Sequence, residues 1–132
     1  MEWEITFTSE PEILTIRAWG PASIEGVKAY FREAVSRPEW KPTISCLLDF
    51  RELDLARLSS DELKVLAGFF DTNREGIADS FIAIIVTRSV EFGVARMWAT
   101  LSEDVGMHQR VFYSLEEGRT WLASVTPVSS RR

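Results

Sequence analysis

The sequence feature that most constrains the fold is an uninterrupted run of six apolar residues, Phe81 to Val86. The run is rich in β-branched residues and does not alternate with polar ones, so both faces of the strand that it predicts must be covered. A second stretch, Ile44 to Phe50, contains the adjacent leucines Leu47 and Leu48 and predicts another strand covered on both faces. We therefore expect the two strands to lie side by side within a sheet, with helices packed on it.

The other periodic patterns predict the element order β-β-α-β-α-β-α-β-α. Alternating apolar residues at 3–8 and 13–19, joined by a turn around Pro11, predict an antiparallel hairpin, and Gly20 to Ala22 is expected to end its second strand. A loop is expected at 106–109, before a short last strand at 111–113. Strands separated by helices are expected to join by right-handed parallel crossovers. The predicted fold is thus an α/β domain with a mixed sheet of about five strands.

Serines mark the expected starts of the helices, because a serine hydroxyl can accept a backbone N–H of the first helical turn. Two of these serines are followed three positions later by a glutamate, which matches the capping box. The four predicted caps are Ser23, Ser59 (with Glu62), Ser89 and Ser114 (with Glu117).

Length and charge limit the class of protein. A chain of 132 residues fits one domain, expected at 1–126 with a flexible tail at 127–132. The net charge of −5 disfavours binding to a nucleic-acid backbone, which needs a basic surface. No apolar stretch approaches the ~20 residues that a membrane span requires, and the acidic N-terminus is unlike a signal peptide. A soluble cytoplasmic protein is expected, and Cys46, within an apolar run, should be buried and unreactive.

Polar side chains follow the two apolar strands at the edge where open α/β sheets place ligands. Asp49 and Arg51 end the first of these strands, while Thr87, Arg88 and Ser89 follow the second. Together they could bind a small anion, although a surface salt bridge plus a helix cap is the simpler interpretation. Arg96 lies on the next helix, beside the small residues Gly93 and Ala95, where it either meets a ligand or is solvated.

No motif predicts catalysis. His108 is the only histidine and has no serine, cysteine or carboxylate placed by sequence as its partner. Phosphate-binding glycine loops, nucleophile elbows and metal-ligand spacings are missing from the sequence, so we expect no enzyme, no cofactor and no metal. Trp3, Trp19 and Trp40 either gather on one exposed face, which would mark an interface, or are dispersed through the core.

The element order resembles the STAS fold, and more closely the SpoIIAA-like (STAS/SEC14) family of small stand-alone proteins. The resemblance spans nearly the whole chain. The segments that carry it are 14–20, 46–51, 82–86, 93–97 and 110–112, together with Glu116, Glu117, Trp121 and Leu122.

The resemblance implies a non-enzymatic regulatory or protein-interaction module with a protein partner, or a second copy of itself. In antagonist-type STAS domains a kinase phosphorylates a serine at the start of the helix after the third strand. Here that region holds Ser59 and Ser60, but Leu58 stands where the family has an aspartate, and Asp61 with Glu62 would repel phosphate. A helix cap is the alternative for Ser59.

A related architecture in CRAL-TRIO lipid-transfer proteins implies a second possibility, a carrier or sensor of a small lipophilic or anionic ligand. Such a carrier needs an interior cavity of roughly 300 Å³ or more.

Overall fold

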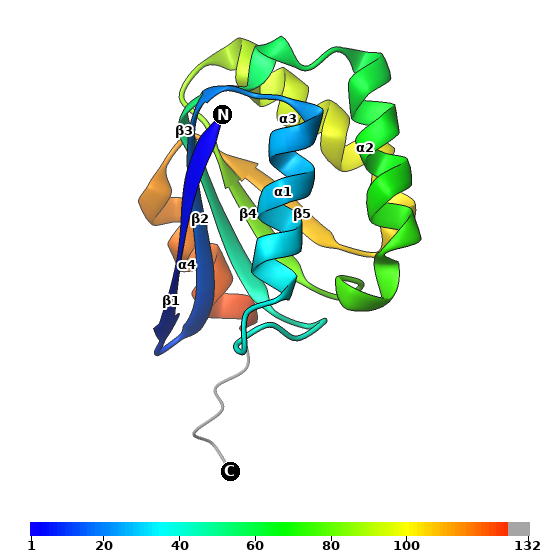
Figure 1. Ribbon diagram of the computed structural model, residues 1–132. Coiled ribbons are helices and arrows are strands. Elements are labelled where there is room, and N and C mark those ends of the chain that lie inside the picture. The colour runs from blue at the N-terminus through cyan, green and yellow to red at the C-terminus, as the bar shows by residue number, and fades with distance from the viewer. Residues whose placement is uncertain (127–132) are drawn as a thin grey trace.

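Five strands form one sheet in the order β1-β2-β3-β4-β5, as the computed structural model describes for residues 1–126 (Figure 1). β1 is antiparallel to β2, and every later neighbour is parallel. The predicted tail at 127–132 lies outside the described residues. The strand bounds are β1 Glu2–Ser9, β2 Glu12–Pro21, β3 Ser45–Asp54, β4 Phe81–Ile85 and β5 His108–Phe112.

Three helices cover one face of the sheet and the fourth covers the other (Figure 1). Each of β3, β4 and β5 is added at the same edge, so right-handed crossovers bring α1, α2 and α3 to the same side. α4 follows the last strand and folds back over the opposite side. The helix bounds are α1 Ile24–Val35, α2 Ser60–Thr72, α3 Ser89–Leu101 and α4 Leu115–Val125, with the short 3-10 turn η1 at Leu55–Arg57.

The two apolar strands lie side by side in the middle of the sheet, as their composition predicts. β3 and β4 pair from Ser45 with Phe81 to Asp49 with Ile85. Ile84 packs toward α1–α3 and Ile85 toward α4, and both are almost completely buried. The prediction that both faces of this strand are covered is confirmed. The mixed α/β sheet is confirmed with it.

The cap and hairpin predictions are mostly confirmed. The Ser23 hydroxyl accepts the Gly26 N–H at 3.0 Å, and Ser59 forms the complete capping box with Glu62. Ser114 accepts the Glu117 N–H at 3.2 Å. The prediction that Ser89 caps α3 is wrong, because the helix already begins at Ser89 and the capping position is Arg88, which makes no side-chain cap bond.

Two predicted strand boundaries, the end of β2 and the start of β5, are wrong. β2 continues through Gly20 to Pro21, since Gly20 adopts a positive φ of 89° that lets the strand bend without breaking. β5 begins at His108 instead of residue 111, so the expected loop at 106–109 is shorter than predicted. Within residues 1–126, the structure has no helix with the length and hydropathy needed to cross a membrane.

Candidate functional site

Asp49 and Arg51 lie together at the carboxyl ends of the parallel strands, where the sequence predicts a site. The Arg51 Nε donates to Asp49 Oδ1 at 2.8 Å and its Nη2 donates to Oδ2 at 2.9 Å. These hydrogen bonds lower the pKa of Asp49, although burial of the carboxyl acts in the opposite direction. The carboxylate is therefore ionised at neutral pH and already satisfied by its partner.

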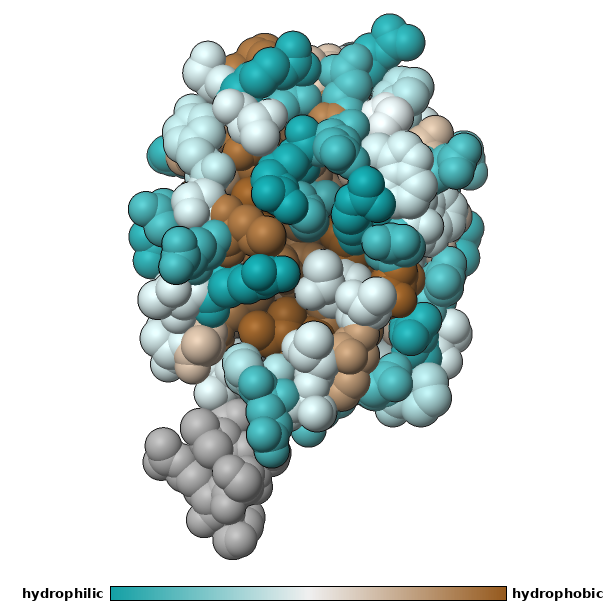
Figure 2. Space-filling model, turned by 90° about the vertical axis from the view of Figure 1, so that its left-hand side faces the viewer, coloured by the Kyte–Doolittle hydropathy of each residue, from teal (hydrophilic) through white to brown (hydrophobic). Residues whose placement is uncertain are grey.

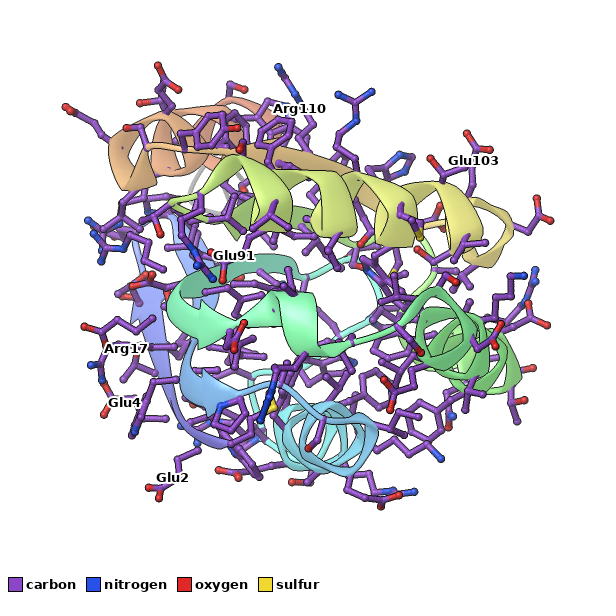
Figure 3. All side chains as sticks on the ribbon, turned by 90° about the horizontal axis from the view of Figure 1, so that it is seen from above. Glu2, Glu4, Arg17, Glu91, Glu103 and Arg110 are labelled. Carbon is purple, nitrogen blue, oxygen red and sulfur yellow. The ribbon has the colours of Figure 1, made fainter. Side chains whose placement is uncertain are left out.

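A hollow of about 340 Å³ lies beside this pair, lined also by Arg17, Glu52 and Thr87. Arg17 Nη2 lies 2.7 Å from Glu52 Oε1, and its guanidinium stacks 4.5 Å from the Trp19 ring. Figure 3, which looks onto this end of the sheet, shows Arg17 near Glu4 at the outer margin. Each arginine of the hollow faces a carboxylate, so the geometry favours the salt-bridge interpretation over an anion site.

Arg88, Ser89 and Arg96 do not join this hollow. Arg88 Nη2 lies 3.0 Å from Glu91 Oε2, which raises the Arg88 pKa, and 3.7 Å from Asp54. Glu91 itself is buried between α3 and η1 (Figure 3), where Oε2 also accepts the Leu55 N–H at 3.3 Å. This buried carboxylate ties α3 to the end of β3, a role that the sequence did not reveal.

Ser59 and Ser60 sit at the start of α2, and Ser59 is held in the capping box. Its hydroxyl accepts the Glu62 N–H at 3.1 Å, and Glu62 Oε1 accepts the Ser59 N–H at 2.9 Å. Ser60 is exposed as the first helical residue. The geometry accounts for Ser59 as a cap, and phosphorylation at either serine stays a prediction.

The interior between β3, β4 and helices α1–α3 contains an apolar cavity of about 40 Å³. Tyr30, Phe50, Leu66, Ala95 and Trp98 are among the residues that line it. This volume admits little more than a single water molecule, far below the ~300 Å³ of a typical ligand pocket. A lipid-sized ligand would need the surrounding helices to move apart.

The titratable groups of the interior show no catalytic arrangement. Burial raises the pKa of the Cys46 thiol to about 12 and also raises the pKa of Tyr30, so both stay protonated at neutral pH. His108 is a strand residue whose ring stacks on Phe81 at 4.7 Å, and its side chain has no hydrogen bond to another described residue. In the described part of the chain, no three histidine, cysteine or carboxylate side chains are grouped as a metal site requires.

The three tryptophans of the N-terminal half do not share an exposed face. The Trp3 indole donates to Glu33 at 2.9 Å on the α1 side of the sheet, and Trp40 donates to the Gly76 carbonyl at 2.7 Å. Trp19 is on the opposite side of the sheet. Figure 2 shows the side on which β1 and α4 lie, where hydrophilic side chains border a strip of hydrophobic surface. The three tryptophans are therefore dispersed and half-buried, with Trp3 and Trp40 packed against the core.

Aromatic side chains also gather around the free edge of β5, a region of which the sequence predicted Arg96 alone as a site residue. The Phe92 ring of α3 stacks on Tyr113 at 4.6 Å, and Tyr113 is 51% exposed. Hollows of about 470 and 890 Å³ flank the strand toward α3 and α4. We call this region the β5 surface and define it by Phe92, Arg96, Arg110, Phe112, Tyr113 and Trp121.

Two arginines occupy the middle of the β5 surface. The Arg110 guanidinium lies 5.2 Å from the Phe112 ring and 5.7 Å from the Trp121 ring. The Arg96 guanidinium lies 6.0 Å from the Phe92 ring. In residues 1–126 neither arginine has a salt bridge, in contrast to Arg17, Arg51 and Arg88. Arg96 is thus exposed on α3, with its guanidinium beside an aromatic ring.

The main chain of β5 is paired on one side only. His108 N–H donates to Ser80 and the Phe112 carbonyl accepts from Val86, so these residues face β4. Alternate residues of a parallel strand bond to opposite neighbours, which leaves the N–H and C=O of Gln109 and Val111 facing outward. When each strand is added beside the preceding one, the last strand lies at an edge of the sheet. The predicted element order could therefore have indicated the free edge of β5.

Comparison with solved structures agrees with this topology. An uncharacterized protein of the DUF3478 family, with a SpoIIAA-like fold, from Shewanella loihica PV-4 aligns with a TM-score of 0.61 over 92% of each chain. This chain has a SpoIIAA-like fold. The sequence identity is 18%, so the SpoIIAA-like similarity concerns the fold alone. No family model matches the sequence, and no curated protein matches it.

Proposed function

We propose that this protein is a non-enzymatic interaction module that binds a protein partner through the β5 surface. The observation that carries the proposal is the combination of an unpaired strand edge with aromatic rings at the surface, Tyr113 exposed and the others half-buried, and two arginines free of salt bridges among the described residues. Aromatic and arginine side chains are enriched at the energetic centres of protein interfaces. An unpaired edge adds main-chain groups that a partner can bind.

The rest of the molecule supports this proposal over an enzyme. Asp49 and Arg51, predicted at the carboxyl ends of the strands, form a salt bridge with each other. Arg88 forms one with Glu91, so each of these charges already has a partner within the protein. His108 lies on a strand against Phe81. A carrier of a lipophilic ligand has less support, because the interior cavity measures about 40 Å³.

Site-specific photo-crosslinking tests the proposed function. A photoreactive amino acid is placed at Tyr113, or at Val65 on α2 as the control, because both side chains are about half exposed. In cells of the source organism, we expect a discrete protein adduct at position 113, lost on Arg110→Glu, and no such adduct at position 65. An absence of adducts at position 113, or the same adducts at both positions, would contradict the proposal.

A further inference from the structure

The two arginines of the β5 surface lie on opposite sides of the sheet edge. Arg110 alternates with His108 and Phe112 on the α4 side, while Arg96 projects from α3 on the other side. Figure 3 shows Arg110 at the margin of the molecule away from Arg17 and Glu4. A strand added beside β5 would present consecutive side chains to opposite sides. One arginine is therefore available to each of two consecutive residues of such a strand.

The charges along the β5 surface change sign from its ends to its middle. Glu103 lines one end of the hollow beside α3, and Glu116 and Glu117 line the far end beside α4. Arg96 and Arg110 lie between them. Complementary charge thus requires an acidic centre in whatever covers this edge.

Two pairs of aromatic rings lie next to the two arginines, one pair on each side of the sheet edge. Phe112 and Trp121 lie 5.9 Å apart on the α4 side, and Phe92 and Tyr113 stack on the α3 side. An added strand places its next two residues, one on each side, against these two aromatic pairs. Main-chain bonds to Gln109 and Val111 would supply affinity that does not depend on sequence.

We infer that the β5 edge binds an extended acidic segment of a partner protein as a sixth strand of the sheet. The segment carries two consecutive acidic residues, which face Arg110 and Arg96, followed or preceded by two apolar or aromatic residues. This inference rests on the proposed function and adds the chemistry of the partner. A second copy of the chain fits less well in the register that aligns Arg110 with itself, since like charges would then face each other.

A displayed library of random twelve-residue peptides, panned on the full chain, tests the inference. We expect enrichment of adjacent acidic residues beside apolar ones, and binding of the synthesised peptide should slow amide exchange at Gln109 and Val111. Arg96→Glu and Arg110→Glu should each weaken that binding tenfold or more. Lys64→Glu, which makes the same charge change on exposed α2, should leave the binding within twofold.

A main-chain variant separates strand addition from simple charge attraction. Val111→Pro removes an outward N–H that no strand of the sheet uses, so the fold should persist while the peptide binds at least tenfold more weakly. If Val111→Pro fails to fold, Arg96→Glu and Arg110→Glu still test the inference.

Several outcomes would overturn the inference. They are no enriched sequence, enriched peptides without acidic residues, binding indifferent to Arg96 and Arg110, or a dimer in sedimentation that Val111→Pro or Arg110→Glu dissociates. A partner crosslinked at Tyr113 that presents a helix or a basic segment would also overturn it, while leaving the proposed function in place. Both are removed if the protein with the photoreactive residue at position 113 and Arg110 intact gives no adduct, or gives the same adducts as the control at position 65.

Discussion

Ser59 and Ser60 are neighbours with different roles at the start of α2. The Ser59 hydroxyl satisfies the Glu62 N–H at 3.1 Å, whereas Ser60 is the first residue inside the helix. Replacing a capping serine by alanine costs about 1 kcal/mol because it exposes an unsatisfied helix donor. We expect Ser59→Ala to lower the free energy of unfolding by about that amount, measured by urea denaturation.

Ser60→Ala is the matched control for the cap. We expect it to change the free energy of unfolding by less than about 0.5 kcal/mol, since surface substitutions away from special contacts are usually small. Equal losses for the two variants would contradict the assignment of Ser59 as the cap.

The Asp49–Arg51 pair makes stability depend on pH. Its hydrogen bonds hold the folded pKa of Asp49 below the unfolded value of about 3.9, so the contribution of the pair is complete above that pH. It is lost as the pH falls through the lowered folded pKa. We expect Arg51→Met to lower the free energy of unfolding by about 1 kcal/mol at pH 7, a modest value because Arg51 is 42% exposed and screened by water.

The difference between wild type and Arg51→Met should shrink below about pH 4, in denaturation series measured from pH 7 to pH 2.5. Arg57→Met is the control, because its guanidinium lies 3.9 Å from Asp54 in an exposed pair. The control should differ from wild type by less than about 0.5 kcal/mol throughout. A difference for Arg51→Met that stays constant down to pH 2.5 would show that the lost interaction is packing and not charge.

The packing of α4 on the sheet depends on the absence of a side chain at Gly118. A Cβ built there would lie 2.5 Å from Ile85 Cδ1, inside a buried layer that also includes Leu47 and Ala83. Alanine gains about 1 kcal/mol over glycine in a helix, but overpacking a core costs roughly 1–3 kcal/mol. We expect Gly118→Ala to destabilise the protein in thermal or urea unfolding.

Two further variants test whether overlap between a Cβ at position 118 and the Ile85 side chain causes this loss of stability. Gly68→Ala on α2 has no neighbouring atom within 4 Å and should stabilise the protein by about 0.5–1 kcal/mol. Ile85→Val removes the methyl group that Gly118 leaves room for, so in that background Gly118→Ala should become neutral or stabilising. Additive effects of the two changes would contradict a direct contact.

The sequence predicts the elements well where their pattern has one physical cause. The β-branched apolar run at 81–86 predicts a strand covered on both faces, which β4 confirms for Phe81–Ile85, and Ser59 with Glu62 predicts a helix start. The prediction for Ser89 is wrong because the first turn of α3 is not held by a local side-chain cap. It is held by a contact with a distant segment, in which the Glu91 carboxylate accepts the Leu55 N–H.

The candidate site was less predictable. Asp49 and Arg51 were found together because they are two residues apart on one strand. The β5 surface joins Phe92, Arg110 and Trp121 from three elements, and their proximity follows only from the packing of α3 and α4 around the edge.

The whole molecule has two apolar layers of unequal size. The layer under α1–α3 contains most of the buried side chains, whereas the layer under α4 is small. A helix that is held by a small apolar layer can detach while the rest of the core stays folded. The buried residues of the smaller layer are Ile13, Leu47, Ala83, Ile85 and Leu122.

Native-state hydrogen exchange should reveal this hierarchy. We expect α4 amides to exchange through a partial opening of lower free energy than the opening that exposes β3 and β4 amides. Leu66→Ala, in the large layer, should lower the free energy for β4 amides by about 2–5 kcal/mol and leave α4 unchanged. Leu122→Ala should lower the opening free energies of α4 amides and of β4 amides alike, because α4 is detached in both open states. Exchange of α4 and β4 at one common free energy in the wild-type protein would instead show that the two layers unfold as a single unit.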